Sequence, residues 1–174
     1  MRRSMSALAI LGALFLASAA PVAAGKPTHT PSEILEPVEL AAGTACDVGI
    51  TINTTVLKGK TSVWEDADGT VRIMDRGFTT GYAESDEGTR STHSGGYRLE
   101  FVFHPDGSLD VNGTGFLFAW YVEGDPIVGL PAPGAYVLRG HLTESYAADG
   151  SLVAARFFGG EVVDLCEVLA PDAS

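Results

Sequence analysis

Cysteine and basic residues are scarce in this chain, and each shortage excludes a class of function. Among 174 residues there are 2 Cys, and 11 Lys and Arg stand against 22 Asp and Glu, so the formal net charge is −11. Two Cys make a four-ligand structural zinc site only with His ligands. Binding to nucleic acid or to an anionic membrane surface needs Lys and Arg to meet phosphates. We therefore expect no nucleic-acid partner, no metal and no cofactor.

Long apolar runs are also missing. The apolar stretch at residues 7–17 is too short to cross a bilayer, which takes about 20 residues. It follows Arg2 and Arg3 and precedes Val22-Ala23-Ala24, a pattern typical of a secretory signal peptide. We expect residues 1–24 to be removed on export, which leaves a secreted protein without a membrane span. The alternative is an uncleaved membrane anchor.

Beyond the signal, the composition divides the chain into a tail and one domain. Three prolines fall within residues 25–45, and proline fixes φ and removes a backbone donor. We expect a flexible, extended tail there, a single β domain over residues 46–170, and a short C-terminal tail over residues 171–174.

Period-two alternation and three Asp-Gly turns indicate an all-β domain. The turns Asp68-Gly69, Asp106-Gly107 and Asp149-Gly150 each precede Ser or Thr, and Asp and Gly tolerate the positive φ of tight hairpins. We expect an antiparallel meander of eight to nine strands that closes into a small barrel, with a sandwich as the alternative. The predicted strands are 47–56, 60–66, 70–76, 97–104, 108–121, 135–147, 151–158 and 161–169, with a further strand at 78–83.

The strand at residues 108–121 contains a change of pattern. Apolar residues occupy odd positions before Gly113 and Gly115 and even positions after them. We interpret this as a glycine bulge that changes the buried face and bends the strand. The apolar run 116–122 is predicted to be buried on both faces. One shared buried face is expected for Val48, Ile50, Ile52, Leu99, Phe101, Phe103, Leu138 and Leu142.

The two cysteines give the most specific prediction. Cys46 opens the first predicted strand and Cys166 lies in the last one. Two Cys in an exported protein are most simply paired. We expect a Cys46–Cys166 disulfide that joins the two ends of the domain. The competing interpretation is a nucleophilic Cys with a His partner.

No catalytic motif is present. The four His, including His93 and His104, show no zinc-protease spacing, and there is no G-x-S-x-G, P-loop or dinucleotide fingerprint. The acidic residues Glu84, Asp86 and Glu87 are interpreted as a solvated loop, with weak calcium binding as the alternative. No catalytic residue and no metal ligand is therefore assigned.

Four residues are the candidates for ligand binding. Trp120 and Tyr136 flank an apolar, proline-rich loop that either plugs a barrel mouth or meets a ligand. Arg139 and His141 share one face of the following strand and could bind a carboxylate if that face lines a cavity. Because the opposite face is apolar, we expect Arg139 and His141 to face solvent.

The order of these features resembles small secreted β-barrel proteins of actinobacterial type. The resemblance covers most of residues 46–169 and is carried by the Pro105-Asp106-Gly107-Ser108 turn, the Gly-Leu-Pro-x-Pro-Gly loop at 129–134 and the closing Val-Asp-Leu-Cys at 163–166. It implies no activity for any residue. Barrels of the allene-oxide-cyclase and lipocalin types are similar in strand number and length alone.

Three functions are compatible with these observations. The first is a non-catalytic β-barrel that binds a small apolar ligand or a cell-surface partner. The second is a small barrel enzyme of isomerase or cyclase type that acts on a hydrophobic substrate. The third is an inert cell-envelope module. The lack of a catalytic constellation favours the first.

Overall fold

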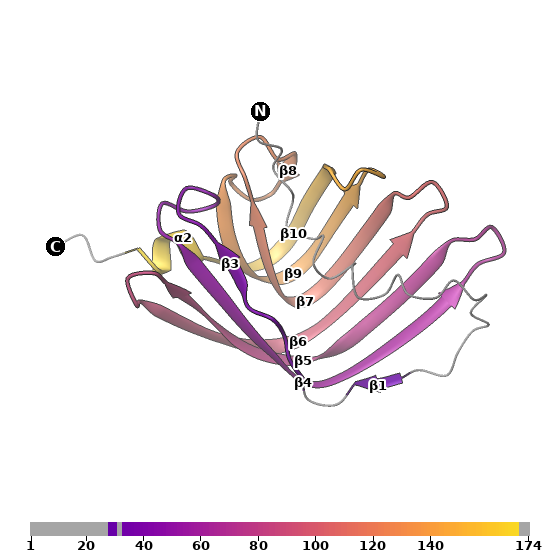
Figure 1. The fold of residues 1–174 in the computed structure, drawn as a ribbon, viewed down its shortest axis with the longest axis horizontal. Helices are drawn as coiled ribbons and strands as arrows, with labels where there is room; N and C mark the ends of the chain where they lie inside the picture. The colour runs from indigo at the N-terminus through magenta and orange to yellow at the C-terminus, as the bar shows by residue number, and fades with distance from the viewer. Residues whose placement is uncertain (1–27, 31–32, 171–174) are drawn as a thin grey trace.

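Strands make up nearly all of the regular secondary structure in this computed structural model, which describes residues 28–30 and 33–170. The predicted signal peptide and the C-terminal tail at 171–174 lie outside the described residues. A single helical turn, α2, follows the last strand in Figure 1. The elements are β1 (Thr28–Thr30), β2 (Glu33–Ile34), β3 (Val38–Leu40), β4 (Ile50–Glu65), β5 (Val71–Ser85), β6 (Arg90–Phe103), β7 (Leu109–Tyr121), β8 (Ile127–Val128), β9 (Gly134–Tyr146), β10 (Leu152–Asp164) and α2 (Leu165–Val168).

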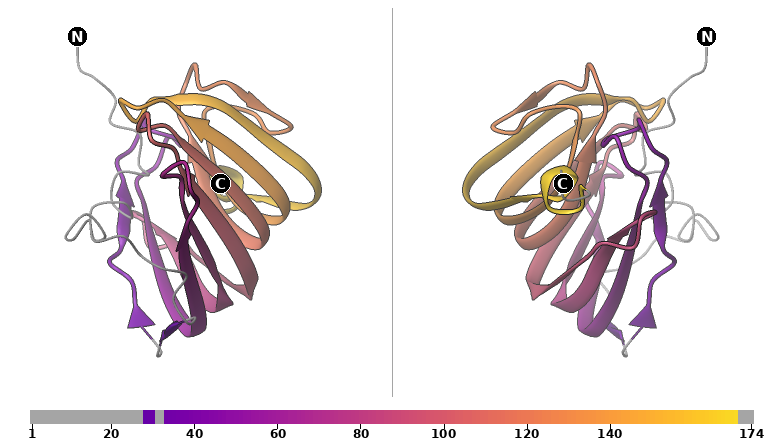
Figure 2. Two further views of the ribbon diagram at one scale, coloured as in Figure 1. Left: turned by 90° about the vertical axis from the view of Figure 1, so that its right-hand side faces the viewer. Right: turned by 90° about the vertical axis from the view of Figure 1, so that its left-hand side faces the viewer.

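The strands form one sheet that curves into an open half-barrel. Its order is β1-β4-β5-β6-β7-β9-β10-β8, and β2 and β3 also pair with β4. The ladders are antiparallel except that of β8 with β10, which is parallel. The prediction of an all-β domain with a meander is confirmed, but the closed barrel is wrong, because β4 and β10 do not pair. Figure 2 shows the purple strand β4 and the yellow strand β10 standing apart.

The three predicted hairpins form around their Asp-Gly turns. Gly69, Gly107 and Gly150 each adopt a positive φ between 81° and 88°. The described residues form six long strands, fewer and longer than the predicted eight to nine: the segments 47–56 and 60–66 merge into β4, with a bulge at Leu57. Residues 165–168 form α2 instead of continuing the last strand, because Asp164 caps the backbone N–H groups of the first helical turn.

Short strands cover the outer edge of β4. β1 pairs with residues 59–61, β2 with residues 55–56 and β3 with residues 50–52. The part of the predicted tail that the structure describes is therefore attached to the sheet. An open sheet edge invites pairing with other chains, and these strands protect this one.

A row of glycines crosses the sheet. Six residues on neighbouring strands pair in register, and five of them are glycine. Without side chains at these positions, the sheet can bend sharply along this line. At Gly140, an added Cβ would collide with the carbonyl oxygen of Gly159. The glycine row consists of Gly59, Gly77, Gly115, Gly140 and Gly160, with Tyr97 between the second and the third.

One hydrogen bond shows how strongly the sheet folds at this row. The Tyr121 hydroxyl donates to Glu144 Oε1 at 2.7 Å. In the β7–β9 ladder Tyr121 pairs with Gly134, ten residues from Glu144. A straight strand would separate those positions by about 33 Å. The ladder must therefore bend toward the side on which these two side chains lie, which we call the inner face; the other is the outer face.

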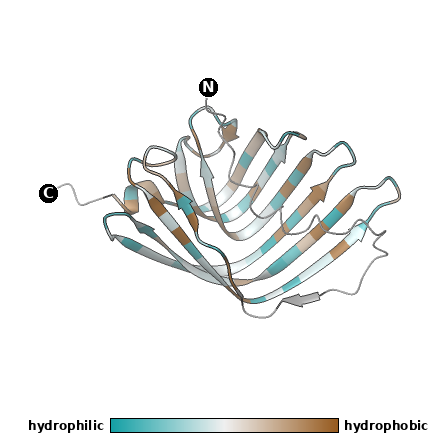
Figure 3. Ribbon diagram, viewed as in Figure 1, coloured by the Kyte–Doolittle hydropathy of each residue, from teal (hydrophilic) through white to brown (hydrophobic). Residues whose placement is uncertain are grey.

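Two apolar clusters fill the fold instead of one. The disulfide-end cluster packs β3, β4 and β5 against β7, β9 and α2, and the inner cluster lies within the bend of β7, β9 and β10, under the loop that contains β8. Figure 3 shows the apolar segments of β3 and α2 beside the sheet. The disulfide-end cluster is Leu40, Ala45, Cys46, Ile50, Ile52, Ala83, Phe116, Ala135, Val137, Leu165 and Leu169, and the inner cluster is Leu117, Ala119, Tyr121, Leu130, Tyr136, Leu138, Leu142, Ala155 and Phe157.

The prediction of a single buried face is consequently wrong. Ile50 and Ile52 belong to the disulfide-end cluster, whereas Leu138 and Leu142 belong to the inner cluster. Phe101 is half-buried and lies in neither cluster. The physical reason is that β7 and β9 have a cluster on each face.

The glycine bulge in β7 also differs from the prediction. Gly115 has a φ of +89°, yet the β7–β9 register continues without a shift. The outer face of β7 therefore stays on even positions and changes from polar Asn112 to apolar Phe116 as it enters the disulfide-end cluster. Phe116 and Leu117 are 3% and 6% exposed, which confirms burial on both faces.

The predicted disulfide joins the two ends of the sheet. Cys46 and Cys166 are bonded, with Cα atoms 5.1 Å apart. The bond ties the loop before β4 to α2. Disulfides are typical of oxidising compartments. A separate finding concerns membranes: no helix within the described residues is long and apolar enough to span one.

Candidate functional site

The four predicted ligand residues do not form one site. Tyr136 lies in the inner cluster, and its hydroxyl donates to the Pro131 carbonyl oxygen at 2.8 Å, a bond that joins β9 to the covering loop. Trp120, Arg139 and His141 lie on the opposite face of the same strands. Trp120 packs against the disulfide-end cluster, whereas Arg139 is exposed and His141 is half-buried.

Arg139 spans the place where β6 and β7 separate. The β6–β7 ladder ends at Tyr97, and beyond it Arg139 donates to the Ser94 carbonyl oxygen at 3.2 Å and approaches Glu161 at 3.5 Å. Burial, followed by the charge of Arg139, lowers the pKa of nearby His93. Arg139 is therefore a surface residue of β9 that connects β6 with β10.

Substitution of Arg139 or His141 by Ala is expected to leave stability almost unchanged. His141 Nε2 bonds Asn112 at 2.8 Å and its ring lies on Phe158, at the surface in both cases. Surface changes of this kind shift unfolding free energy by about 0.5 kcal/mol or less. Urea unfolding of each variant checks this, and a loss of about 2 kcal/mol would contradict the outer position of these side chains.

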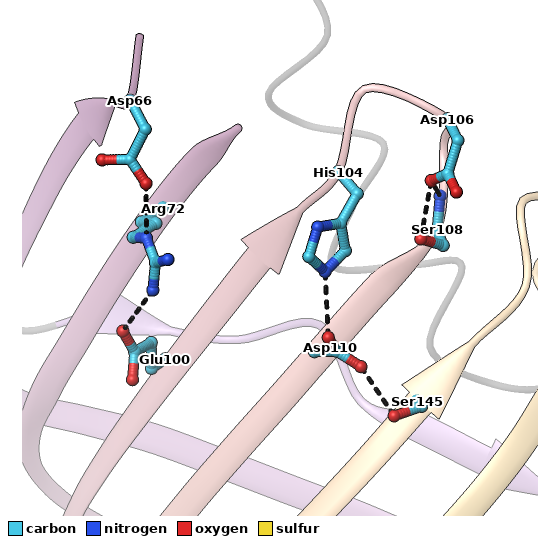
Figure 4. Close-up of polar contacts among 8 residues, drawn as sticks. All are labelled: Asp66, Arg72, Glu100, His104, Asp106, Ser108, Asp110 and Ser145. Atoms are coloured by element: carbon cyan, nitrogen blue, oxygen red, sulfur yellow. Dashed lines mark hydrogen bonds and ion pairs between the residues drawn. The ribbon is translucent and has the colours of Figure 1, made fainter. Parts of the chain in front are cut away.

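A chain of Ser, Asp and His near the β6–β7 turn has the composition of a catalytic triad. Ser145 Oγ donates to Asp110 at 2.6 Å, and His104 Nε2 lies 2.9 Å from the other Asp110 oxygen, as Figure 4 shows. These contacts lower the pKa of Asp110. A nucleophilic serine needs the imidazole as its base. Here the carboxylate stands between Ser145 and His104, so the order is unsuitable for acyl transfer.

Glu144 is the one buried acid among the described residues, with 7% of its surface exposed. It accepts hydrogen bonds from Tyr121 at 2.7 Å and from Tyr146 at 2.9 Å. Burial raises the pKa of Glu144, although both hydroxyl bonds act in the opposite direction; the charge of Asp125 adds to the increase. Burial and Glu144 in turn raise the pKa of both tyrosines. With its oxygens engaged inside the inner cluster, Glu144 holds the bend together.

A row of cations crosses the outer face one position from the glycine row. Lys60 on β4 pairs with Arg76 on β5, which pairs with Arg98 on β6. We call these three residues the cation row; Lys58 lies two residues away on the same face. Directly opposite like charges destabilise a sheet. Arg76 and Arg98 are exposed and Lys60 is half-buried.

Among the described residues, the cation row lacks carboxylate partners that would neutralise it. In the described part of the chain, neither its three residues nor Lys58 forms an ion pair with a carboxylate. Arg98 Nε contacts the Met74 sulfur at 2.9 Å, which is a weak acceptor. By contrast, Arg72 on the same face is paired with Asp66 at 2.8 Å (Figure 4). Unpaired positive charge is thus concentrated on three neighbouring strands of an acidic protein.

An open depression of about 430 Å³ adjoins the cation row. Tyr97, one of its lining residues, donates its hydroxyl to Asp75 at 3.0 Å, and burial followed by the Asp75 charge raises the pKa of Tyr97. Asp75 also accepts from Thr61 at 3.1 Å, so its charge is partly satisfied. The depression is lined by Lys58, Gly59, Lys60, Arg76, Gly77 and Tyr97.

The acidic segment at residues 84–87 shows no metal-like cluster. Glu84 pairs with Arg90 at 2.6 Å, and Asp86 and Glu87 are exposed. Over residues 28–30 and 33–170, no three His, Cys, Asp or Glu side chains gather closely enough to hold a metal ion.

Sequence reasoning missed both Glu144 and the cation row, although each left a signal. Glu144 has the same parity as Leu138 and Leu142, so alternation places it on their buried face. Pairing outward from the Asp68-Gly69 turn sets Lys60 opposite Arg76. The third cation depends on the register between β5 and β6. The turn at residues 85–89 sets that register with the same backbone hydrogen bonds as the Asp-Gly hairpins, but it carries Glu87-Gly88 in place of Asp-Gly.

Comparison with known proteins gives no assignment. The chain matches no family model, and no curated protein or solved structure matches it significantly.

Proposed function

We propose that this protein is a non-catalytic binding module of an oxidising compartment that holds an anionic partner on its cation row. The observation that supports this most directly is the alignment of Lys60, Arg76 and Arg98 on adjacent strands without a carboxylate partner among the described residues. Each pair of like charges in the row, Lys60 with Arg76 and Arg76 with Arg98, lowers the stability of the free protein. An anion laid across the row removes that cost and gains charge-assisted hydrogen bonds.

The overall acidity restricts where such a partner can bind. With a net charge of −11, most of the surface repels anions. The exposed cations Arg76 and Arg98, with Lys58 beside them, form a local exception. Binding at this place should be specific in position and weaken with salt, because exposed charges are screened within about 8 Å at physiological ionic strength.

The polar groups support binding over catalysis. Ser145, Asp110 and His104 stand in the wrong order for nucleophilic attack, and Glu144 is enclosed by two tyrosine hydroxyls. The Cys46 sulfur is engaged in the disulfide and is not a nucleophile. A charged surface, together with described residues that show no aligned acid and base, is suited to holding a partner.

The test replaces the cation row by neutral residues of similar length. The triple variant Lys60→Gln, Arg76→Gln, Arg98→Gln is expected to lose at least tenfold in affinity for dextran sulfate, measured by calorimetry at low salt, because each cation contributes to anion attraction. Uncharged dextran serves as the ligand control. Raising the salt should weaken wild-type binding and have little effect on the triple variant.

Arg90 provides the matched protein control. It is an exposed arginine on β6, eight residues before Arg98, and it is paired with Glu84 at 2.6 Å. Arg90→Gln removes a positive charge outside the row and should change affinity less than twofold. Equal losses for Arg90→Gln and Arg98→Gln, or equal binding of dextran and dextran sulfate, would refute a local anion site.

A second candidate, an apolar ligand or partner, has its own supporting observation. Several large apolar side chains are exposed near the β10 edge, where β8 pairs with residues 155–156 alone. Native mass spectrometry of protein purified from its own culture medium would show a bound apolar molecule as added mass. The exposed side chains are Val128, Val153, Phe158, Val162 and Val168.

A further inference from the structure

We infer that the anionic partner is a linear acidic polysaccharide with one carboxylate per sugar, laid across the strands from β4 to β10. This inference rests on the proposed function and narrows its ligand class. The cross-strand row does not stop at Arg98. Its partner on β7 is Thr114, which pairs with His141 on β9, and His141 pairs with Phe158 on β10.

The spacing of the row fits a polymer with regularly repeated charges. Neighbouring strands lie about 4.8 Å apart, so three cations in register present positive charge at that interval. A chain of uronic acid sugars repeats its carboxylate over a similar distance. A polyphosphate carries its charges more closely, and an extended peptide of acidic residues advances only about 3.3 Å per side chain.

Exposed aromatic rings flank the charges on the same face. Phe78 is 37% exposed and pairs in register with Lys58, beside the first cation of the row. Phe158 is 42% exposed, lies at the far end and contacts the His141 ring at 5.2 Å. The C–H bonds of a pyranose ring are slightly positive and meet the negative face of an aromatic ring. Polyphosphate and acidic peptides lack such a sugar face.

Small polar groups occupy the middle of the row. Thr114 is exposed between Arg98 and His141, and Asn112 is exposed one pair away, bonded to His141 at 2.8 Å. A hydroxyl and an amide both donate and accept hydrogen bonds, as sugar hydroxyls require. The row thus combines cations for carboxylates, polar groups for hydroxyls and rings for the sugar faces.

The experiment measures binding of fluorescently labelled oligogalacturonates of one to eight sugars by anisotropy. From Lys60 to Phe158 the row crosses six strands, about 24 Å, which about five sugars cover. Affinity should rise with each sugar up to about that length and then level off. Hexaglutamate, a short polyphosphate and the methyl-esterified, uncharged oligogalacturonate are measured beside it.

Two aromatic variants separate this inference from the proposed function. Phe78→Ala and Phe158→Ala should each weaken oligogalacturonate binding at least threefold and leave polyphosphate binding unchanged, with Val153→Ala as the control for an exposed apolar residue off the row. If hexaglutamate or polyphosphate binds as tightly and the aromatic variants have no effect, the polysaccharide is excluded while anion binding stands. If the neutral ester binds equally well, or no anion binds, both proposals fail.

Discussion

The double variant Cys46→Ala, Cys166→Ala is expected to lose about 4–5 kcal/mol of unfolding free energy, because a disulfide across 120 residues removes much of the freedom of the unfolded chain. The bond also holds α2 against the sheet: Leu165 and Leu169, both fully buried, pack with Leu40 in the disulfide-end cluster. Guanidinium unfolding of the oxidised wild type and of the variant gives the difference.

Reduced wild-type protein controls for the alanine side chains. It should unfold at the same denaturant concentration as the double variant, since Cys46 and Cys166 are replaced without a large change in volume. Amide exchange should show α2 opening before the β7–β9 ladder. A loss below about 1 kcal/mol would mean that α2 and the loop before β4 remain docked without the covalent bond.

The chain positions of the main elements were predictable because they depend on local chemistry. The hairpin turns at Gly69, Gly107 and Gly150 follow from the positive φ that Asp-Gly sequences tolerate. The Cys46–Cys166 pair followed from the presence of two cysteines in a chain with an export signal. Neither inference needs knowledge of how distant strands are arranged.

The closure of the sheet was not predictable because it depends on cooperation between strands. The positions of Gly115 and Gly140 are visible in the sequence, but their alignment in one row exists only after the registers are known. The glycine row lets β7 and β9 bend, so the inner face of these strands packs in the inner cluster and their outer face packs in the disulfide-end cluster. Alternation alone treats both apolar sets as one face, which led to the expectation of one shared buried face.

In the candidate site, too, features within one strand were predictable and features that depend on strand pairing were not. Arg139 and His141 were correctly expected to share a face, because both lie in one strand. Tyr136 was grouped with them by its nearness to the apolar loop, although its parity is opposite. The cation row draws its residues from separate strands, and its identification required the pairing of Arg76 with Arg98.

Glu144→Ala is expected to destabilise the protein by about 2–4 kcal/mol, because two buried tyrosine hydroxyls lose their acceptor and each costs about 1–3 kcal/mol when unpaired. Glu144 is 7% exposed, and its hydrogen bond with Tyr121 connects opposite ends of the β7–β9 ladder. Glu144→Gln keeps the volume and one acceptor oxygen, so it should cost about 1–2 kcal/mol. Urea unfolding near neutral pH measures both. Glu161→Ala is the matched control, as this exposed glutamate should cost about 0.5 kcal/mol or less.

The pH dependence of stability provides a separate test of the buried carboxyl. Burial raises the folded-state pKa of Glu144 above its ordinary value of 4.5. The folded state then binds the proton more tightly than the unfolded state, so this group contributes stability at low pH that is lost as the pH rises from 4.5 through the raised folded-state pKa. The stability of the wild type relative to Glu144→Gln should therefore fall over that interval. A rise instead would mean that the hydrogen bonds from Tyr121 and Tyr146 stabilise the carboxylate more than burial disfavours it, and the bend would then be held by an ionised Glu144.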